Sequence, residues 1–269
     1  MASASAVAQA PLEAASLVQC EVSEGIGHIT LNHPQKRNAL SRAMLEALRQ
    51  ALQQQGADPA VRVIVLAGNG PVFSSGHDLK EFVGADPDSV TSLLKLCTQV
   101  MELPRQLPKP VIAQVAGLAS AAGCQLAASC DLVLASSQAH FQTPGVNIGL
   151  FCSTPMVPLS RAVPPKKAME MLLTGQAITA QEAERAGLVS RVVAPERLAQ
   201  ETQAMARHIA SFSAETLALG KQAFYRQLPL EISAAYGVGQ EAMLHNSQMQ
   251  DAQEGMTAFL QKRPPHWHS

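Results

Sequence analysis

The fold is decided by the stretch from Val111 to Ala135, which reads VIAQVAGLASAAGCQLAASCDLVLA. The apolar runs 111–115 and 132–135 are typical of short strands buried on both faces of a sheet. Between them, small residues at 118–123 predict a tight loop, and the pattern at 124–129 predicts a short helix. Because strands that alternate with helices build parallel sheets, this stretch predicts an α/β core.

The same stretch has to be tested as a membrane span, because residues 111–130 are twenty residues without a formal charge. That length reaches the criterion for a membrane-spanning helix. Polar residues such as Gln114 and Gln125 interrupt the run, however, and Gly117 and Gly123 break it. We therefore expect a buried core segment and no membrane span.

Hydrophobic spacing predicts the other elements on both sides of this stretch. On the N-terminal side we expect two strands, a helix, a strand and a helix that stops before a proline: Val18–Glu24, Ile26–Leu31, Ser41–Gln54 with Ser41 as its cap, Val61–Ala67, and Thr91–Leu103 before Pro104. On the C-terminal side we expect two helices, a strand and four helices: Lys167–Leu173, Ala180–Ala186, Leu188–Val193, Leu198–Phe212, Ala214–Arg226, Leu230–His245 and Gln250–Gln261. This order predicts a flexible N-terminal arm over 1–17, a core over 18–200 and a helical region over 201–269.

Composition excludes several classes of protein. The chain has 269 residues, 47% of them hydrophobic, and a formal net charge of −1. Those values exclude intrinsic disorder and offer no basic surface for nucleic acid. Its five cysteines form no CxxC pair, so neither a disulfide framework nor a metal site is expected, and the thiols indicate a reducing compartment. Residues 1–17 lack the arginines of a mitochondrial presequence, and are either the remainder of a trimmed one or an arm.

Short motifs occur in order from about Val18 to Trp267. They are His33-Pro34, Asn38-Ala39-Leu40, Val65-Leu66-Ala67-Gly68, Phe73-Ser74-Ser75-Gly76-His77-Asp78-Leu79, Pro108-Lys109-Pro110, Gly117, Gly123-Cys124-Gln125-Leu126-Ala127, Cys130-Asp131-Leu132, Leu173-Thr174-Gly175, Gly187-Leu188-Val189 and Lys262-Arg263-Pro264. Each motif is weak alone, but the ordered set resembles the crotonase (enoyl-CoA hydratase/isomerase) superfamily.

The resemblance implies an α/β fold: a superhelix of four ββα turns with a helical C-terminal trimerisation region. It implies a homotrimer or a dimer of trimers, a coenzyme A thioester as ligand, and no other cofactor. It also implies fatty-acid or lipid metabolism in the mitochondrial matrix. Chemistry in this family passes through a thioester enolate, so the site has to hold the carbonyl oxygen as negative charge develops on it.

In the family, two backbone N–H groups form this oxyanion hole, and the resemblance places them at His77 and Ala122. The residues agree, because Ser74-Ser75-Gly76 is a permissive turn and Ala122 stands where a helix N-terminus carries partial positive charge. Family hydratases have Gly at the position of Ala122, so its methyl group requires either an ordinary φ or strain. The alternative for this small-residue run is tight loop packing alone.

The acid and base of a family hydratase are missing. Its two glutamates align with Gln125 and Gly145, and the only formal charge between 111 and 160 is Asp131. An amide does not transfer protons in this role and glycine has no side chain, so we expect enoyl-CoA hydration to be weak or absent. The sequence predicts an acyl-CoA-binding protein in which restoring both glutamates restores some hydration.

Several alternatives stay open. An active enzyme could carry out hydrolysis, decarboxylation or isomerisation with the His77 ring or a water held by Gln125. The alternative for the His77 ring is that it is only packed or solvated. Two other functions of the protein also stay open: a purely structural role in a mixed hexamer with an active paralogue, and RNA binding. For the remaining polar residues we expect structural roles: Asp78 in a turn or as a helix cap, Asp131 as a hydrogen-bond acceptor, His140 at the surface or behind the residues of the site, and Cys152 in ordinary packing. The alternative for His140 is a position facing the acyl pocket.

The resemblance also implies contacts to coenzyme A. Lys36 and Arg37 would approach the phosphates, and the loop of Ser75, His77, Asp78 and Leu79 would face the adenine. Lys262 would reach the ligand of a neighbouring subunit. For each single cation, a solvated surface position is the alternative reading.

Overall fold

The computed structural model describes residues 16–269. The predicted N-terminal arm, residues 1–17, lies outside this described part except for its last two residues. No helix within the described part is long and apolar enough to cross a membrane.

The elements alternate as strands and helices before the chain becomes helical. The strands are β1 (Val18–Ser23), β2 (Ile26–Leu31), β3 (Val63–Gly68), β4 (Val72–Ser74), β5 (Val111–Val115), β6 (Leu118–Ser120), β7 (Leu132–Ser136), β8 (His140–Gln142), β9 (Ile178–Thr179) and β10 (Arg191–Val193). The α-helices are α1 (Arg42–Ala57), α2 (Pro87–Gln106), α3 (Ala122–Ser129), α4 (Met156–Ala162), α5 (Pro165–Thr174), α6 (Ala180–Ala186), α7 (Leu198–Ala210), α8 (Ala214–Gln227), α9 (Ile232–Gln248) and α10 (Gln250–Leu260). Short 3-10 turns are η1 (Pro34–Lys36), η2 (Leu79–Glu81), η3 (Pro144–Ile148) and η4 (Pro195–Arg197).

The strands form two sheets, and successive turns of the chain place one strand in each. The larger sheet has the order β1-β2-β3-β5-β7-β10 and the smaller one β4-β6-β8-β9. All pairs are parallel except β1 with β2 and β8 with β9. The repeated strand–strand–helix turn confirms the expected ββα superhelix.

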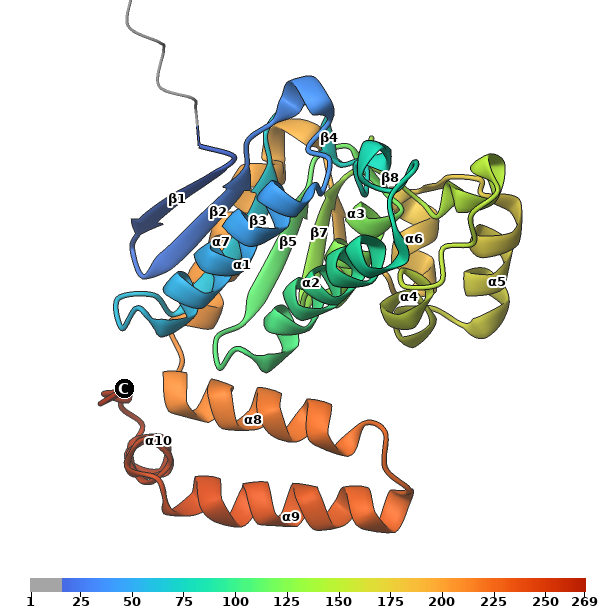
Figure 1. Ribbon diagram of the computed structural model, residues 1–269. Helices are drawn as coiled ribbons and strands as arrows, with labels where there is room; N and C mark the ends of the chain where they lie inside the picture. The colour runs from blue at the N-terminus through green and yellow to red at the C-terminus, as the bar shows by residue number, and fades with distance from the viewer. Residues whose placement is uncertain (1–15) are drawn as a thin grey trace, which may run out of the picture.

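Helices cover both faces of the larger sheet. Figure 1 shows α1 and α2 in front of the sheet and α7 behind it. Helix α1 presents Leu45, Leu48 and Leu52, all fully buried, to the main core, at the spacing that the sequence predicts. The second, smaller apolar cluster contains Leu198 and Ala206 of α7 together with residues of β2, β3, β5 and β7. Apolar side chains on both faces explain why the central strands read as continuous hydrophobic runs.

Helix α2 extends further at both ends than the predicted Thr91–Leu103. It begins at Pro87 because the Asp86 side chain accepts a hydrogen bond from Ser89 N at 2.9 Å. It continues through Pro104, where the prediction of a stop was wrong. A proline in the last turn removes only one backbone N–H from the helix. Its carbonyl remains available, and accepts a hydrogen bond from Lys221 Nζ at 2.5 Å.

Three further expectations need correction. The predicted loop over 118–123 contains β6 and the first two residues of α3. The predicted strand Leu188–Val193 is shortened to β10, and the two-stranded pair of β8 with β9 was not predicted. Strands of two or three residues leave no alternating pattern in a sequence, which is why spacing does not detect them.

Helices α8, α9 and α10 form a layer apart from the sheets (Figure 1). A partly buried group, which we call the Asp131 cluster, fastens α8 to the core. Lys221 Nζ donates to Asp131 Oδ2 at 2.6 Å and to the Lys109 carbonyl at 2.7 Å, and Tyr225 Oη donates to Asp131 Oδ1 at 2.8 Å. The guanidinium of Arg105 lies 4.4 Å from the centre of the Tyr225 ring. Asp131 is therefore the structural acceptor that the sequence predicts.

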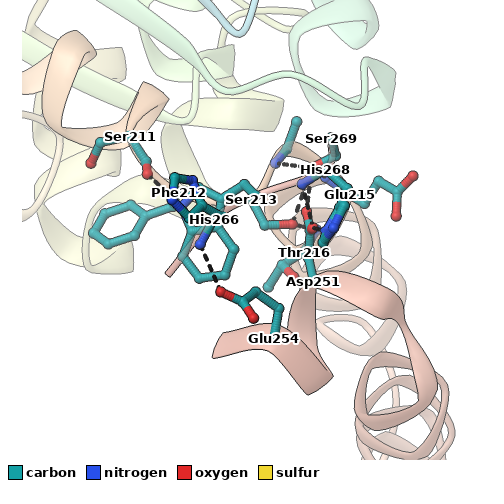
Figure 2. A network of polar contacts seen from close by, with 12 residues as sticks. Ser211, Phe212, Ser213, Glu215, Thr216, Asp251, Glu254, His266, His268 and Ser269 are labelled. Atoms are coloured by element: carbon teal, nitrogen blue, oxygen red, sulfur yellow. Dashed lines mark hydrogen bonds and ion pairs between the residues drawn. The ribbon is translucent and has the colours of Figure 1, made fainter. Parts of the chain in front are cut away.

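The C-terminal tail folds back onto the junction of α7 and α8, as Figure 2 shows. Asp251 of α10 is buried and accepts hydrogen bonds from His268 N at 2.7 Å and Ser269 Oγ at 2.6 Å. Trp267 Nε1 donates to the Ser211 carbonyl at 2.8 Å. Although burial raises the pKa of Asp251, the hydrogen bonds from Ser269 and His268 hold it below its ordinary value.

Candidate functional site

The two segments expected to form an oxyanion hole are packed against each other. A Cβ on Gly76 would lie 2.8 Å from Ala121 Cβ and 3.2 Å from Ala122 N. A Cβ on Gly123 would lie 2.3 Å from the Ser74 carbonyl oxygen. All three distances are shorter than ordinary van der Waals contacts, so only glycine fits at Gly76 and Gly123. The two glycines thus allow the turn after β4 to pack onto the N-terminus of α3.

Strain at this junction falls on Ala121 and not on Ala122. Ala121 is the N-cap of α3 with φ 49° and ψ −118°, a conformation that favours glycine. Ala122 is the first residue of α3 and is not among the residues with positive φ, so its own methyl group is accommodated without such strain. A non-glycine residue in a sparsely populated region costs about 1–3 kcal/mol. The surrounding structure holds it there: Ala121 N donates to the Gln142 carbonyl at 2.9 Å.

Both predicted N–H donors are unused within the described chain. Among the hydrogen bonds of residues 16–269, none has the backbone N–H of His77 or of Ala122 as its donor. The neighbours of these groups are bonded, since Leu40 N donates to the Gly76 carbonyl at 2.8 Å and Gln125 N to the Ala121 carbonyl at 3.0 Å. Ala122 is also at a helix N-terminus, where free N–H groups favour negative charge. Two backbone donors without a partner among the described residues therefore lie in segments that pack against each other.

The ring of His77 points into the protein. Its Nδ1 lies 3.3 Å from the Leu40 carbonyl, its centroid lies 5.4 Å from that of Phe82, and its Nε2 is buried without a partner in the described chain. Burial lowers the pKa of His77, while the Leu40 carbonyl and the charge of Glu81 oppose this shift. These contacts favour the reading in which the backbone of His77, and not its ring, serves the site.

Gln125 lies one helical turn after Ala122 on α3. The side chain is 5% exposed, and its Oε1 has no hydrogen-bond partner among the described residues. An unpaired buried amide oxygen costs free energy, about 1–3 kcal/mol. The side chain can therefore orient a hydrogen-bond donor such as water, but it carries no transferable proton.

Gly145 shows that the second glutamate position is closed as well as empty. A Cβ on Gly145 would lie 2.5 Å from the Leu150 carbonyl oxygen and 2.9 Å from Cys152 Sγ. The loop is fixed in this position, because Leu150 N donates to the Gly145 carbonyl at 2.9 Å and Gly145 N to Cys152 Sγ at 3.4 Å. Restoring a glutamate here thus requires the backbone to move, which the sequence alone does not reveal.

A cavity of about 140 Å³, the α2–α3 cavity, adjoins Gln125. Its wall includes Glu102 and Arg105 of α2, Ser129 of α3, and Thr154 before α4. No carboxylate lies close to Gln125 in the sequence other than Asp131, whereas Glu102 reaches the same cavity from α2. On α2, Glu102 and Arg105 are three positions apart and so share a helix face, but this spacing does not show that the face meets Gln125.

The other polar candidates have structural positions. Asp78 caps η2, its Oδ1 accepting from Lys80 N at 3.1 Å, as expected. His140 is exposed on β8 with Nδ1 3.0 Å from the Gln138 carbonyl. Cys152 is buried, and burial raises the pKa of its thiol, which agrees with ordinary packing.

Most of the predicted coenzyme A contacts lie together, and Lys262 does not. Lys36 and Arg37 are exposed, and Ser75 N donates to the Arg37 carbonyl at 3.0 Å, so their turn adjoins the loop of Ser75, His77, Asp78 and Leu79. Lys262 follows α10, which lies at the opposite end of the molecule from β4 (Figure 1).

Comparison with known proteins gives one consistent result. A family model described as enoyl-CoA hydratase/isomerase matches residues 21–269. The chain is 51% identical over 252 residues to "Enoyl-CoA hydratase domain-containing protein 3, mitochondrial" of Rattus norvegicus, covering 93% of this chain and 84% of the relative. It is 42% identical to a "Probable enoyl-CoA hydratase" of Rhizobium meliloti (strain 1021), covering 90% of this chain and 94% of the relative.

Solved structures agree with the sequence matches. The crystal structure of human enoyl-coenzyme A hydratase domain-containing protein 3 superposes with a TM-score of 0.91 at 50% identity, covering 93% of this chain and all of that one (100%). An enoyl-CoA hydratase of Mycobacterium smegmatis also gives a TM-score of 0.91, at 46% identity, covering 94% of this chain and 99% of that one.

Proposed function

Because the chain belongs to the enoyl-CoA hydratase/isomerase family, we propose that it binds acyl-CoA thioesters with the carbonyl oxygen between the N–H groups of His77 and Ala122. The observation that carries this proposal is the pair of unused donors in two segments packed against each other. A donor of this kind stabilises a developing oxyanion by about 2.7–4 kcal/mol. Backbone donors also explain how the side chain at either position can differ from those of other hydratases.

The same proposal makes the protein a weak or inactive enoyl-CoA hydratase, and a candidate pseudoenzyme. Hydration needs one group to take a proton from water and another to supply a proton to the thioester enolate. Neither Gln125 nor Gly145 offers such a group, and the Leu150 carbonyl and the Cys152 sulfur fill the space beside Gly145. Each positioned proton-transfer group contributes about 10²–10⁴-fold, and losses of groups that act together are not additive.

A second candidate function is favoured by the buried, unpaired Gln125 Oε1. A water that donates to this oxygen would stand one turn of α3 from the thioester, which suits hydrolysis. Isomerisation and decarboxylation would use the same hole to hold the enolate, but the His77 ring, whose Nε2 is buried, would first have to turn toward the thioester to carry a proton.

Coenzyme A would be held by the exposed pair Lys36 and Arg37 and by the loop from Ser75 to Leu79. Lys262 would contribute from a neighbouring copy in a homotrimer or a dimer of trimers, since within one chain it lies far from this loop. The helical layer supports association, because large apolar side chains are exposed on it: Ile232, Tyr236, Met243, Leu244, Phe259 and Leu260.

For its setting we propose fatty-acid or lipid metabolism in the mitochondrial matrix. The names of the vertebrate relatives and of one from Dictyostelium discoideum include the word mitochondrial. No cofactor beyond the thioester is part of the proposal.

The test combines binding and turnover. Calorimetry compares butyryl-CoA with the butyl-CoA thioether, which lacks the carbonyl oxygen, and loss of the enoyl absorbance of crotonyl-CoA measures hydration. We expect micromolar binding of the thioester, about tenfold weaker binding of the thioether, and negligible hydration. Equal affinity for butyryl-CoA and the thioether would show that the N–H groups of His77 and Ala122 do not bind the carbonyl oxygen. Turnover of crotonyl-CoA at the 1–10³ s⁻¹ of ordinary enzymes would overturn the pseudoenzyme assignment.

A further inference from the structure

The α2–α3 cavity, beside a site proposed for a hydrocarbon chain, has a largely apolar wall in which a few polar and charged side chains are set. Gln125 forms one side and is 5% exposed, with its Oε1 unpaired among the described residues. Ser129 follows one turn later, and its Oγ donates to the Gln125 carbonyl at 2.8 Å, which leaves the hydroxyl oxygen able to accept. A cavity that took only alkyl groups would leave the Gln125 amide without a partner, at a cost in binding.

The two charged side chains on the wall oppose each other in sign. Glu102 and Arg105 both line the cavity, and no ion pair within 4.0 Å joins either of them to another side chain of residues 16–269. The Tyr225 ring supports the Arg105 guanidinium at 4.4 Å, and Asp131 holds the Tyr225 hydroxyl, so the guanidinium is positioned in advance. A carboxylate in the cavity would be attracted by Arg105 but repelled by Glu102. An ammonium group would be attracted by Glu102 but repelled by Arg105. A neutral group that both donates and accepts hydrogen bonds satisfies both.

The position of the cavity sets the length of chain that reaches it. At a rise of about 1.5 Å per residue, Gln125 lies about 4.5 Å and Ser129 about 10.5 Å along α3 from Ala122. An extended hydrocarbon chain advances about 1.3 Å per carbon, so a chain held at Ala122 reaches Ser129 after about eight carbons. The cavity itself has about 140 Å³.

We propose that the α2–α3 cavity receives the far end of the acyl chain and selects thioesters of about eight to ten carbons that carry a hydroxyl group near that end. The hydroxyl donates to Glu102 or to Gln125 Oε1 and accepts from Arg105. This inference rests on the proposed function, since it requires the thioester to be held at His77 and Ala122.

Calorimetry with four ligands tests the inference on the intact protein. They are butyryl-CoA, decanoyl-CoA, 10-hydroxydecanoyl-CoA and the mono-CoA thioester of decanedioic acid. We expect the hydroxylated chain to bind about tenfold more tightly than decanoyl-CoA, because it adds hydrogen bonds to charged partners, and more tightly than the chain that ends in a carboxylate.

Variants on one helix locate the effect. Glu102→Gln and Arg105→Met are each expected to reduce the tenfold preference to threefold or less. Lys95→Met, at an exposed position of α2 outside the cavity, should leave it unchanged. Butyryl-CoA ends beside Gln125, short of Ser129, and carries no hydroxyl group, so unchanged binding of this ligand shows that each variant is folded.

The outcomes separate the two proposals. Failure of butyryl-CoA to bind wild-type protein would remove the proposed function and this inference with it. Binding of butyryl-CoA, together with equal affinity for decanoyl-CoA and 10-hydroxydecanoyl-CoA, would overturn the inference alone. Tightest binding of the carboxylate-ended chain would also overturn it, because the cavity would then act as a cationic site.

Discussion

Replacing Gly145 by alanine tests whether the second glutamate position is closed. The added Cβ would lie 2.5 Å from the Leu150 carbonyl oxygen and 2.9 Å from Cys152 Sγ. The oxygen is a backbone atom held by the bond from Leu150 N to the Gly145 carbonyl at 2.9 Å, so it does not move aside as a side chain does. Overpacking of this kind costs about 1–3 kcal/mol, and the backbone contact places Gly145→Ala at the upper end. At about 2–4 °C per kcal/mol, a loss of about 3 kcal/mol should lower the melting temperature by about 6–12 °C.

The assay is thermal unfolding followed by circular dichroism at neutral pH. Gly220→Ala in α8 is the matched control, because nothing lies within 4 Å of the Cβ it would add, and it should leave the melting temperature unchanged or slightly higher. A second variant, Gly145→Ala with Cys152→Ala, is compared with Cys152→Ala alone, because the latter loses the hydrogen bond from Gly145 N; the double variant should remain less stable than Cys152→Ala, since the contact with the Leu150 carbonyl persists. A melting temperature of Gly145→Ala within 1 °C of wild type would refute the reasoning that the loop is closed over this position.

The same reasoning extends to activity. Gln125→Glu with Gly145→Glu restores both carboxylates of a family hydratase. Since the glutamate at 145 has to displace the Leu150 backbone, we expect the double variant to be less stable than Gly145→Ala and to hydrate crotonyl-CoA poorly. Hydration at the rate of an ordinary enzyme in a stably folded double variant would contradict this.

Three further predictions concern other parts of the molecule. Ala121→Gly should raise the free energy of unfolding by about 1 kcal/mol by releasing the strain at φ 49°, and a decrease in urea unfolding would show that the alanine is not strained. Lys221→Met should lower the free energy of unfolding by about 3 kcal/mol, because the largely buried Asp131 loses the cation that it pairs with. An unchanged midpoint of urea unfolding would show that the ion pair of Lys221 and Asp131 contributes nothing to stability. Trp267, the single tryptophan, should report release of the C-terminal tail by fluorescence. The pKa of Asp251 is lowered in the folded chain, so its contribution is complete above its ordinary value of 3.8 and decreases as the pH falls below it. Asp251→Asn should release the tail at neutral pH, and fluorescence identical to wild type would contradict the role of this carboxylate.

Much of the fold could be predicted from the sequence, because local signals and packing agree there. Helix α6 has the predicted bounds, fixed by the Thr179 capping box and by Gly187 at its end. The hairpin of β1 and β2 and the cap at Ser41 also agree. The predicted start of α2 was wrong because the Asp86 cap was not recognised, and the predicted end was wrong because a proline in the last turn does not stop the helix at once.

Some features of the candidate site can likewise be read from the sequence, and others cannot. The absence of carboxylates at Gln125 and Gly145 can be read from the chain directly. That Leu150 covers Gly145, that strain falls on Ala121, and that Glu102 shares a cavity with Gln125 all depend on distances between segments. No pattern within one segment encodes such a distance, so these features required the structure.

The Asp131 cluster also has a thermodynamic consequence. Arg105 lies on the wall of the α2–α3 cavity and, through Tyr225, against the helix that begins the exposed C-terminal layer. A ligand in the cavity would hydrogen-bond to Arg105. A neighbouring copy that packs on α8 would act on the same residue through Tyr225. Linkage between two such equilibria is reciprocal: whatever factor ligand binding applies to subunit association, association applies to ligand affinity. In this protein, chain-end selectivity and quaternary structure would then vary together with protein concentration.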